Sequence, residues 1–477
     1  MTADTAHDHP VAAAQGPDTQ RPDAHRPDTQ RPDAHRPDTQ RPDAARIARA
    51  ALTRLVEPGD ALAVHAVAAL GPERALVLLT GREAIQPAER DLLAEHAGAP
   101  DTLARRWSAG LDRWAPRAAR LDPVRDLVAL HRLGGGLLVP EDEAWPAALD
   151  DLGDAAPLGL WFRGPGTLPP ASRALAVVGS REATAYGRAV TTRLAAHAVQ
   201  QGVCVVSGGA YGIDGAAHRA ALAAPVGPED SDAHDGPGGA SDRVPPTVAV
   251  LAGGLDRFYP AGHEDLLREV MAAGLLVSEM PPGASPTRYR FLQRNRVIAA
   301  LAGAVLVVEA RWRSGAQNTA GHAFGLGREV GAVPGPVTSP SSAGCHRLLQ
   351  ETPARLVTSE TEALALLDGG APAPRPGGTG GENTAPPGDA PAPPPGGTGG
   401  GNTAPSSPAS AASPVRVTDG LSVEEALVHE ALPLRQAVPV DRITVSAGLA
   451  LPTVLASLSR LQRAGLARRV EDRWRRA

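Results

Sequence analysis

Six short apolar runs between residues 175 and 336 each end at a turn that carries glycine, serine or a charged residue. Three of these turns contain Gly179-Ser180-Arg181, Ser207-Gly208-Gly209 and Gly253-Gly254, the last followed by Arg257. Glycine lets the backbone approach a ligand closely, backbone amides at a helix start bind anions, and arginine adds a bidentate donor. These residue types at this spacing predict an anion-binding site, with a helix that starts near Tyr186 after the first turn.

A second basic segment, residues 286–296, alternates arginines with aromatic rings. Its members are Arg288, Tyr289, Arg290, Phe291, Arg294, Asn295 and Arg296. Because cations neutralise phosphates and aromatic rings stack on bases, the alternation favours a polyanion-binding surface over a solvated run of charges. We expect this segment to precede an apolar helix at Val297–Leu301. Ser314 and Gly315 mark another helix start, after a strand that ends at Glu309.

Composition excludes several classes of chemistry. The chain contains no lysine, which excludes a Walker lysine and a Schiff base with pyridoxal phosphate. Its two cysteines, Cys204 in a predicted strand and Cys345 in a predicted loop, have no metal-ligand spacing and fit a reducing cytosol. His218 has no evident partner and is interpreted as a packed structural histidine. We therefore predict no metal and no cofactor. The net charge of −5 requires any nucleic-acid site to be a local basic patch.

The apolar runs themselves indicate the fold. They are short and β-branched, and amphipathic helical stretches separate them, as in a parallel sheet covered by helices on both faces. Ligands of such sheets bind at the carboxyl ends of the strands, where the turns described above lie. The predicted class is therefore α/β.

Several segments of different composition surround this sheet. Residues 1–45 form a proline-containing five-residue repeat and residues 368–414 a linker of glycine and proline, neither of which can form a core. Residues 46–133 show helical periodicity and predict a small helical domain of the SAM or helix-hairpin-helix kind. Residues 134–367 hold the sheet, with an acidic loop inserted at 224–246.

The last segment, residues 415–477, is expected to run helix, turn, helix and two basic strands, the order of a winged helix. DNA recognition and protein docking both stay open for it, because the predicted helix Pro452–Ala464 has no basic outer face. The sequence shows neither a signal peptide nor an apolar run long enough to span a bilayer, so we expect a cytoplasmic protein.

Taken together, these segments closely resemble the DNA-processing protein A family (DprA, also called Smf). The most specific motifs are Ser-Gly-Gly-x-x-Gly-Ile-Asp at residues 207–214 and Arg-Asn-Arg-x-Ile at residues 294–298. The resemblance is strong over residues 136–367 and looser on either side. Tyr211 departs from it, since the family commonly has arginine at this position.

The resemblance implies an extended Rossmann-like domain that binds single-stranded DNA and forms a homodimer. It also implies that the protein protects incoming DNA and loads the recombinase RecA during natural transformation, and that it is a binding protein without a catalytic residue rather than an enzyme. The residues that would line the DNA groove are Gly179, Ser180, Arg181, Ser207, Gly208, Gly209, Gly253, Gly254, Arg257, Arg294, Asn295, Arg296, Ser314 and Gly315.

Two other functional classes stay open. Nucleoside-monophosphate phosphoribohydrolases have a similar fold but carry Pro-Gly-Gly-x-Gly-Thr before a catalytic glutamate, whereas this domain has Pro334-Gly335-Pro336. Glu279 and Glu309 nevertheless remain as strand-end carboxylates, so hydrolysis of a nucleotide is the alternative. The third class is a transcription regulator that reads duplex DNA through residues 415–477.

Overall fold

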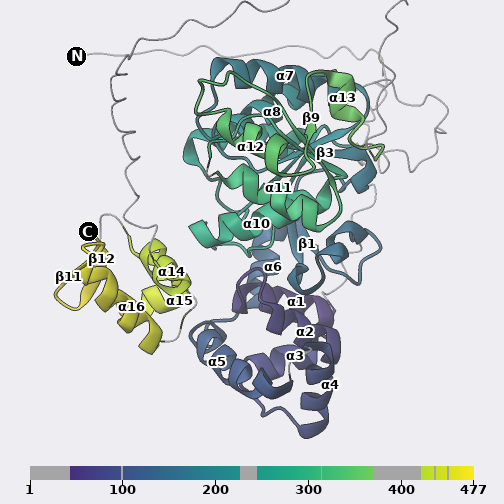
Figure 1. Cartoon of the computed structure of the whole chain (residues 1–477). Coiled ribbons are helices and arrows are strands. Elements are labelled where there is room, and N and C mark those ends of the chain that lie inside the picture. Colours follow the sequence, from purple (N-terminus) through teal and green to yellow (C-terminus); the bar gives the residue numbers. More distant parts are fainter. Residues whose placement is uncertain are drawn as a thin grey trace, which may run out of the picture. The chain divides into compact units, whose positions relative to one another are not determined.

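The computed structural model describes residues 43–97, 100–225, 244–312, 314–369, 421–433, 437–447, 449 and 451–477 (Figure 1). Most of the predicted repeat, of the acidic insertion and of the glycine–proline linker lies outside these residues, so those three predictions are not addressed further.

A nine-stranded sheet forms the centre of the described part, in the order β1-β2-β6-β5-β4-β3-β7-β8-β9. The strands are β1 (Gly135–Leu138), β2 (Leu160–Arg163), β3 (Ala174–Val178), β4 (Cys204–Ser207), β5 (Thr247–Leu251), β6 (Leu275–Ser278), β7 (Ala304–Val307), β8 (Glu329–Ala332) and β9 (Arg355–Leu356). The six apolar runs correspond to β3–β8, which pair in parallel. The whole sheet is mixed, because β2, for which no strand was predicted from the sequence, pairs antiparallel with both β1 and β6.

Helices cover both faces of this Rossmann-like sheet, because most positions of the central strands are apolar and alternate residues point to opposite faces. In β3, Leu175 and Val177 pack against α7 (Ala185–Gln200) and α8 (Ile213–Ala223). Ala176 and Val178 face the other way, toward α10 (Arg288–Leu301) and α11 (Gly315–Gly325). The other helices of this region are α9 (Glu264–Ala273), α12 (Ala343–Glu351) and α13 (Glu360–Leu364).

The strand order changes direction at β3, which lies between β4 and β7. In open α/β sheets such a reversal leaves a crevice beyond the carboxyl ends of the two central strands, and ligands commonly bind there. The residues that follow β3 and β7 therefore decide what this crevice can hold.

Two local predictions were wrong. Helix α10 begins at Arg288, not at Val297, because the Thr287 hydroxyl accepts a hydrogen bond from the backbone N–H of Arg290 (3.2 Å) and caps the helix there. Most of the basic segment thus lies inside the helix. Cys345 lies in α12 rather than in a loop, and both cysteines are buried.

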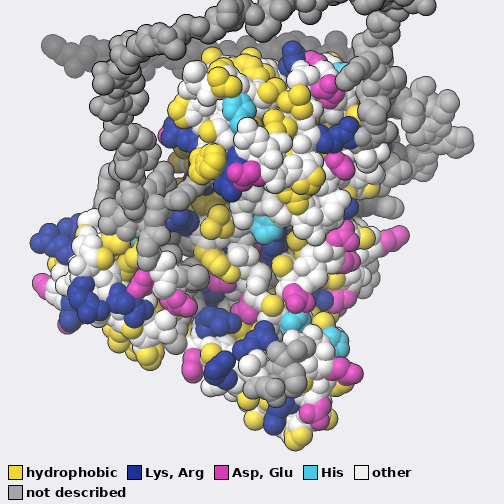
Figure 2. Space-filling model, in the orientation of Figure 1, with side chains coloured by type: hydrophobic (Ala, Val, Ile, Leu, Met, Phe, Trp, Pro, Cys, Tyr) yellow, Lys and Arg dark blue, Asp and Glu magenta, His cyan; other side chains and the backbone are white. Residues whose placement is uncertain are grey.

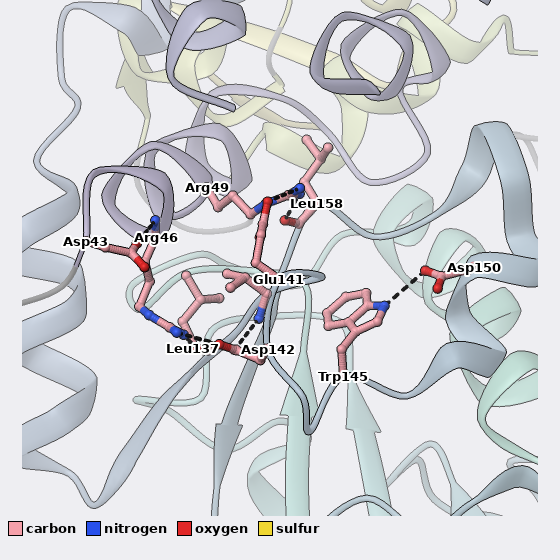
Figure 3. A network of polar contacts seen from close by, with 10 residues as sticks. Asp43, Arg46, Arg49, Leu137, Glu141, Asp142, Trp145, Asp150 and Leu158 are labelled. Carbon is pink, nitrogen blue, oxygen red and sulfur yellow. Dashed lines mark hydrogen bonds and ion pairs between the residues drawn. The ribbon is translucent and has the colours of Figure 1, made fainter. Parts of the chain in front are cut away.

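Helices precede the sheet between residues 44 and 132. They are α1 (Ala44–Leu55), α2 (Ala61–Leu70), α3 (Pro72–Leu79), α4 (Pro87–Ala97), α5 (Pro100–Ala118) and α6 (Pro123–Arg132). Their shared core contains Leu52, Leu62, Leu78 and Trp114. Figure 3 shows how α1 is fixed to the chain after β1: Arg49 contacts Glu141, and Arg46 contacts both Asp142 and the carbonyl of Leu137 (2.6 Å).

The end of the chain forms a small unit with its own core, built around Val428, Ile443, Leu458 and Trp474. Its helices are α14 (Val423–Ala431), α15 (Val440–Ala447) and α16 (Leu451–Arg463), and its strands are β10 (Val438–Pro439), β11 (Ala467–Val470) and β12 (Arg473–Arg476). The strands form an antiparallel sheet in the order β10-β12-β11. Figure 2 shows arginine side chains gathered over this unit.

Candidate functional site

The turns after β3, β4 and β7 are joined directly by backbone hydrogen bonds. The N–H of Ser180 donates to the carbonyl of Glu309 (2.7 Å), and the N–H of Ile213 donates to the carbonyl of Ser180 (3.1 Å). Gly212 has a φ of +82°, and a Cβ at this position would lie 2.1 Å from the carbonyl oxygen of Ser180. The turns can therefore meet only because residue 212 is glycine.

The carboxylate of Glu309 fills the crevice between β3 and β7. Its oxygens accept hydrogen bonds from the backbone N–H of Thr184 (3.0 Å) and from the Thr184 hydroxyl (2.5 Å), at the start of α7. A Cβ on Gly187 would lie 2.3 Å from this carboxylate, and Glu309 is only 2% exposed. The carboxylate of Glu309 is thus the anion at the start of α7, where the sequence predicted an anion from a ligand.

The glycine turn after β4 is held from inside by Arg294. The guanidinium donates to the carbonyls of Gly208 (2.6 Å) and Val250, and a Cβ on Gly208 would lie 2.6 Å from both Arg294 and Asp214. Burial lowers the pKa of Arg294 to about 10, against the opposing charge of Asp214, and burial raises the pKa of Asp214. Ser207 is also buried and donates to the carbonyl of Val177 (2.7 Å).

The next two residues of the Arg-Asn-Arg motif also bind within the protein. Arg296 is almost fully buried and forms an ion pair with Glu279 (2.6 Å), whose pKa is raised by burial although Arg296 opposes the shift. The Asn295 amide donates to the carbonyl of Gly315 (3.3 Å) and to the Asn318 side chain (3.1 Å). The motif therefore links α10 to β4, β5, the end of β6 and the start of α11.

His218 is fully buried, as expected of a structural histidine, and its Nδ1 lies 2.7 Å from the hydroxyl of Thr247. Burial lowers its pKa to about 3, so the imidazole is neutral near pH 7.

A group of aromatic and arginine side chains continues from these buried contacts to the surface, since Arg294 lies 5.7 Å from the centroid of the half-buried Phe291 ring. The guanidinium of Arg181 lies over the ring of Phe291 (5.0 Å to the centroid), and the ring of Tyr259 is tilted against that of Phe291 (5.7 Å between centroids). We call Arg181, Tyr259 and Phe291 the Phe291 cluster. It joins the turn after β3, the turn after β5 and helix α10, and the ring of Tyr259 is 53% exposed.

Two further side chains at this edge of the sheet are open to solvent. The Arg257 side chain is 88% exposed, with Asp256 3.7 Å away. Tyr211 is 46% exposed, and its ring stands edge-on against His263 (4.7 Å) while its hydroxyl accepts a hydrogen bond from the N–H of Gly262 (3.2 Å). An aromatic ring thus occupies the position at which the resemblance predicts arginine.

The structure separates the predicted groove residues by exposure. Arg181, Arg257 and Gly315 are exposed, whereas Gly179 and Ser314 are half-buried. The buried ones are Ser180, Ser207, Gly208, Gly209, Gly253, Gly254, Arg294, Asn295 and Arg296. Their contact with a ligand stays a prediction, and their contacts within the protein are those given above.

The groove residues that the resemblance implies do not include Tyr211, Tyr259 or Phe291, although Phe291 belongs to the basic segment predicted to form a polyanion-binding surface. Their rarity was the available signal, since the chain has four phenylalanines and four tyrosines in all. In the described ranges, no group of three or more histidine, cysteine or acidic side chains could hold a metal ion. Nor is any described helix long and apolar enough to cross a membrane.

Residues 136–368 match the family model of DNA recombination-mediator protein A. A Mycobacterium tuberculosis protein (strain H37Rv), provisionally named DNA processing protein DprA, is 44% identical over 365 residues, which covers 73% of this chain and 79% of the relative. The chain belongs to the DprA family. The DNA processing protein DprA of Streptococcus pneumoniae (strain R6) is 38% identical over 227 residues, which is 48% of this chain and 72% of that protein.

Solved structures of DprA proteins also align with this chain. The S. pneumoniae DprA structure has a TM-score of 0.48 at 26% identity and covers 68% of this chain and 97% of that one. A Helicobacter pylori DprA structure, whose description refers to its single-stranded DNA binding mode, has a TM-score of 0.41 at 25% identity, with 49% and 96% covered.

Proposed function

We propose that this protein binds single-stranded DNA at the carboxyl edge of its sheet, with the Phe291 cluster as the centre of the site. The observation that carries the proposal is that two exposed side chains, Arg181 and Tyr259, both contact the ring of Phe291. The membership of the DprA family and the single-stranded DNA named for the H. pylori relative support the choice of ligand.

The chemistry of the cluster fits a flexible strand better than a duplex. Arginine neutralises a phosphate, and exposed aromatic rings stack on bases that are not already stacked in a helix. Arg257 and the exposed Arg288 add two positive charges nearby, and Tyr211 adds a further ring. Since the family's usual arginine is a tyrosine here, we infer that this chain exchanges one phosphate contact for one stacking contact.

The wider role follows from the family. We infer a cytoplasmic recombination mediator that acts as a homodimer, protects single-stranded DNA and loads RecA onto it in natural transformation. Light scattering of the purified protein tests the dimer. Loading is tested by the lag before RecA hydrolyses ATP on DNA coated with a single-strand-binding protein, which this protein should shorten.

Titration of labelled oligothymidylate and of a matched duplex, followed by fluorescence anisotropy over a salt series, tests the proposed site. Arg181→Ala should reduce the slope of log affinity against log salt by about 0.7, the value for one phosphate contact on a single strand. Tyr259→Ala should weaken binding about fivefold or more with the slope unchanged, because a stacking contact releases no counterion.

Arg173→Ala is the matched control. Arg173 is an exposed arginine at the amino end of β3, on the opposite edge of the sheet, and donates to the carbonyl of Gly202 (3.2 Å). Wild-type affinity and slope are expected for this variant. Equal losses in Arg173→Ala and Arg181→Ala would contradict the placement of the site.

The geometry gives little support to the alternative function, hydrolysis of a nucleotide. A catalytic glutamate has to reach a substrate, but Glu309 is held by Thr184 and Glu279 by Arg296, and both are buried or nearly so. Incubation of the protein with AMP should therefore release no adenine. Adenine release that is lost in Glu309→Gln would restore the hydrolase.

We also propose that residues 421–477 form a winged helix, since helices α14–α16 are followed by the antiparallel pair β11 and β12. Leu451 and Leu455 on α16 are each 43% exposed, which favours protein docking over reading of a duplex. A duplex selection experiment that returned a preferred sequence would overturn this assignment.

A further inference from the structure

A further exposed aromatic side chain, Trp312, lies beyond the Phe291 cluster on the same edge of the sheet. It follows β7, and 55% of its surface is exposed. The other tryptophans, at positions 107, 114, 145, 161 and 474, are each at most 9% exposed. Burying a ring as large as indole is strongly favourable, so a tryptophan left in solvent on an otherwise well-packed chain calls for a partner.

The loop that carries Trp312 is held in place. The side-chain amide of Gln317 donates to the carbonyls of both Arg311 and Trp312 (2.9 Å each). The N–H of Gly344 donates to the carbonyl of Ala310 (2.7 Å), and a Cβ on Gly344 would lie 2.6 Å from the carbonyl oxygen of Arg311. The indole therefore projects from a fixed backbone, which lowers the entropy lost when a ligand binds.

A cation accompanies this ring, as in the Phe291 cluster. The guanidinium of Arg347 lies 5.0 Å from the centroid of the Trp312 ring. Arg347 also forms an ion pair with Glu351 one turn along α12 (2.7 Å), and both side chains are more than one third exposed. We call Trp312 and Arg347 the Trp312 pair.

A row of contacts connects the Trp312 pair with the Phe291 cluster. Arg181 lies over Phe291, and its neighbour Glu182 forms an ion pair with Arg311, the residue before Trp312. Both members of that ion pair are exposed, at 57% for Arg311 and 74% for Glu182. The carboxylates of Glu182 and Glu351 reduce the positive charge along the row, so the aromatic rings have to supply much of its affinity.

We propose that the Trp312 pair is a second stacking subsite for the same single strand, which runs from the Phe291 cluster past Arg181 and Arg311 to a base stacked on Trp312. This inference rests on the proposed function. It predicts that the length of the strand decides whether Trp312 is used, because a short oligonucleotide held at the Phe291 cluster does not reach it.

Oligothymidylates of increasing length, titrated against the full-length protein, test the subsite. Trp312→Ala should bind the shortest oligomers as the wild type does and lose about fivefold or more in affinity for the long ones. Val128→Ala is the control, since Val128 is an exposed apolar residue on α6 (42% exposed) outside the row. Its affinity should be unchanged at every length.

Tryptophan fluorescence gives an independent measurement. Because Trp312 is the exposed tryptophan, acrylamide should quench a component of the emission that is missing in Trp312→Phe. Long oligothymidylate should protect this component and short oligothymidylate should not.

The outcomes separate the two proposals. If Arg181→Ala weakens binding while Trp312→Ala binds every length normally, the subsite is wrong and the proposed function stands. If the wild type binds no single-stranded DNA, both proposals fall. If the quenchable component disappears as protein concentration rises without DNA, Trp312 contacts a second copy of the chain and the subsite is overturned.

Discussion

The arginines near the carboxyl ends of the parallel strands form two groups that differ in burial. Arg294 and Arg296 donate to carbonyls and to a carboxylate inside the protein, whereas Arg181 and Arg257 face solvent. Arg294 and Arg296 are at most 6% exposed, so a phosphate in solvent does not reach their guanidinium groups, in which Nε of Arg294 and Nε and Nη1 of Arg296 lack a hydrogen-bond partner among the described residues. The exposed group is therefore the one that we expect to determine the salt dependence of DNA binding.

Replacement of Arg294 by alanine should affect stability before it affects binding. It leaves the carbonyl of Gly208 and the carboxylate of Asp214 buried without their cation, a change that typically costs about 3–5 kcal/mol. Denaturant unfolding measures the loss. Arg257→Ala, with its exposed side chain, should stay within about 0.5 kcal/mol of the wild type and lose DNA affinity instead. A stable Arg294→Ala protein with weakened binding would favour a direct phosphate contact.

Because of Glu57, the stability of the folded protein should depend on pH in the acid range. Burial alone would raise its pKa, but the charges of Arg117 and Arg290 outweigh burial and lower the pKa from 4.5 to about 2. A carboxyl with a depressed pKa in the folded state stabilises that state by about 3 kcal/mol above pH 4.5. This stabilisation is lost as the pH falls from 4.5 toward 2.

Glu57→Gln should therefore be less stable than the wild type at pH 7 and differ less from it near pH 3. Urea unfolding of both proteins across this range measures the difference. A constant gap between the two curves would show that Glu57 contributes through packing rather than through its charge.

At the scale of elements, glycine residues determine how closely the turns approach one another. Gly212→Ala should destabilise the protein by about 1–3 kcal/mol, because a Cβ there meets the Ser180 carbonyl oxygen and φ is positive. Gly321→Ala is the matched control, since Gly321 lies within α11 and a Cβ would meet nothing within 4 Å. It should stabilise by about 0.5–1 kcal/mol. Thermal unfolding that ranks the two variants in the reverse order would contradict this account.

The sequence alone was sufficient for the parallel strands β3–β8 and for the edge at which their turns meet. It was not sufficient for β1 and β2, since Gly-Gly-Leu-Leu and Leu-Trp-Phe-Arg lack the β-branched character of a buried strand. The predicted start of α10, at Val297, was too late because four arginines in eleven residues are typical of an exposed segment before a helix. Burial of Arg290, Arg294 and Arg296 depends on Glu57, Asp214 and Glu279, which are distant in the sequence.

The glycines after β4 are a second case in which long-range contacts could not be predicted from the sequence. In the sequence, Gly208 and Gly209 indicate a backbone that a ligand can approach closely. In the structure, a Cβ on Gly208 meets Arg294 and Asp214, and Gly209 has a φ of +67° beside Leu251 and Leu267. Valine at either position is therefore expected to reduce the stability of the folded protein.

At the scale of the whole molecule, the helices before the sheet and the sheet itself share buried charges. Glu57 at the end of α1 pairs with Arg290 of α10 (2.8 Å), and Arg54 donates to Asp126 and to the carbonyl of Pro282 (2.6 Å). A fragment of residues 43–369 should therefore unfold in one transition and bind single-stranded DNA like the full chain.

Removal of residues 43–133 from that fragment should prevent stable folding, because Arg290 would lose its carboxylate. Calorimetry of both fragments tests this. Two separate transitions in the longer fragment, or a stable shorter one, would show that the helices are an independent domain.

The outer strands of the sheet limit how two copies of the chain can associate. Strand β9 has only two residues, and at the opposite edge Arg46 already donates to a carbonyl of β1. Neither edge offers a long row of unpaired backbone groups, so a strand of another molecule finds little to pair with. Such edges disfavour both a continuous intermolecular sheet and lateral aggregation of the α/β domain. A homodimer would then have to form through side chains on helices or loops, where single substitutions can separate it without disturbing the sheet.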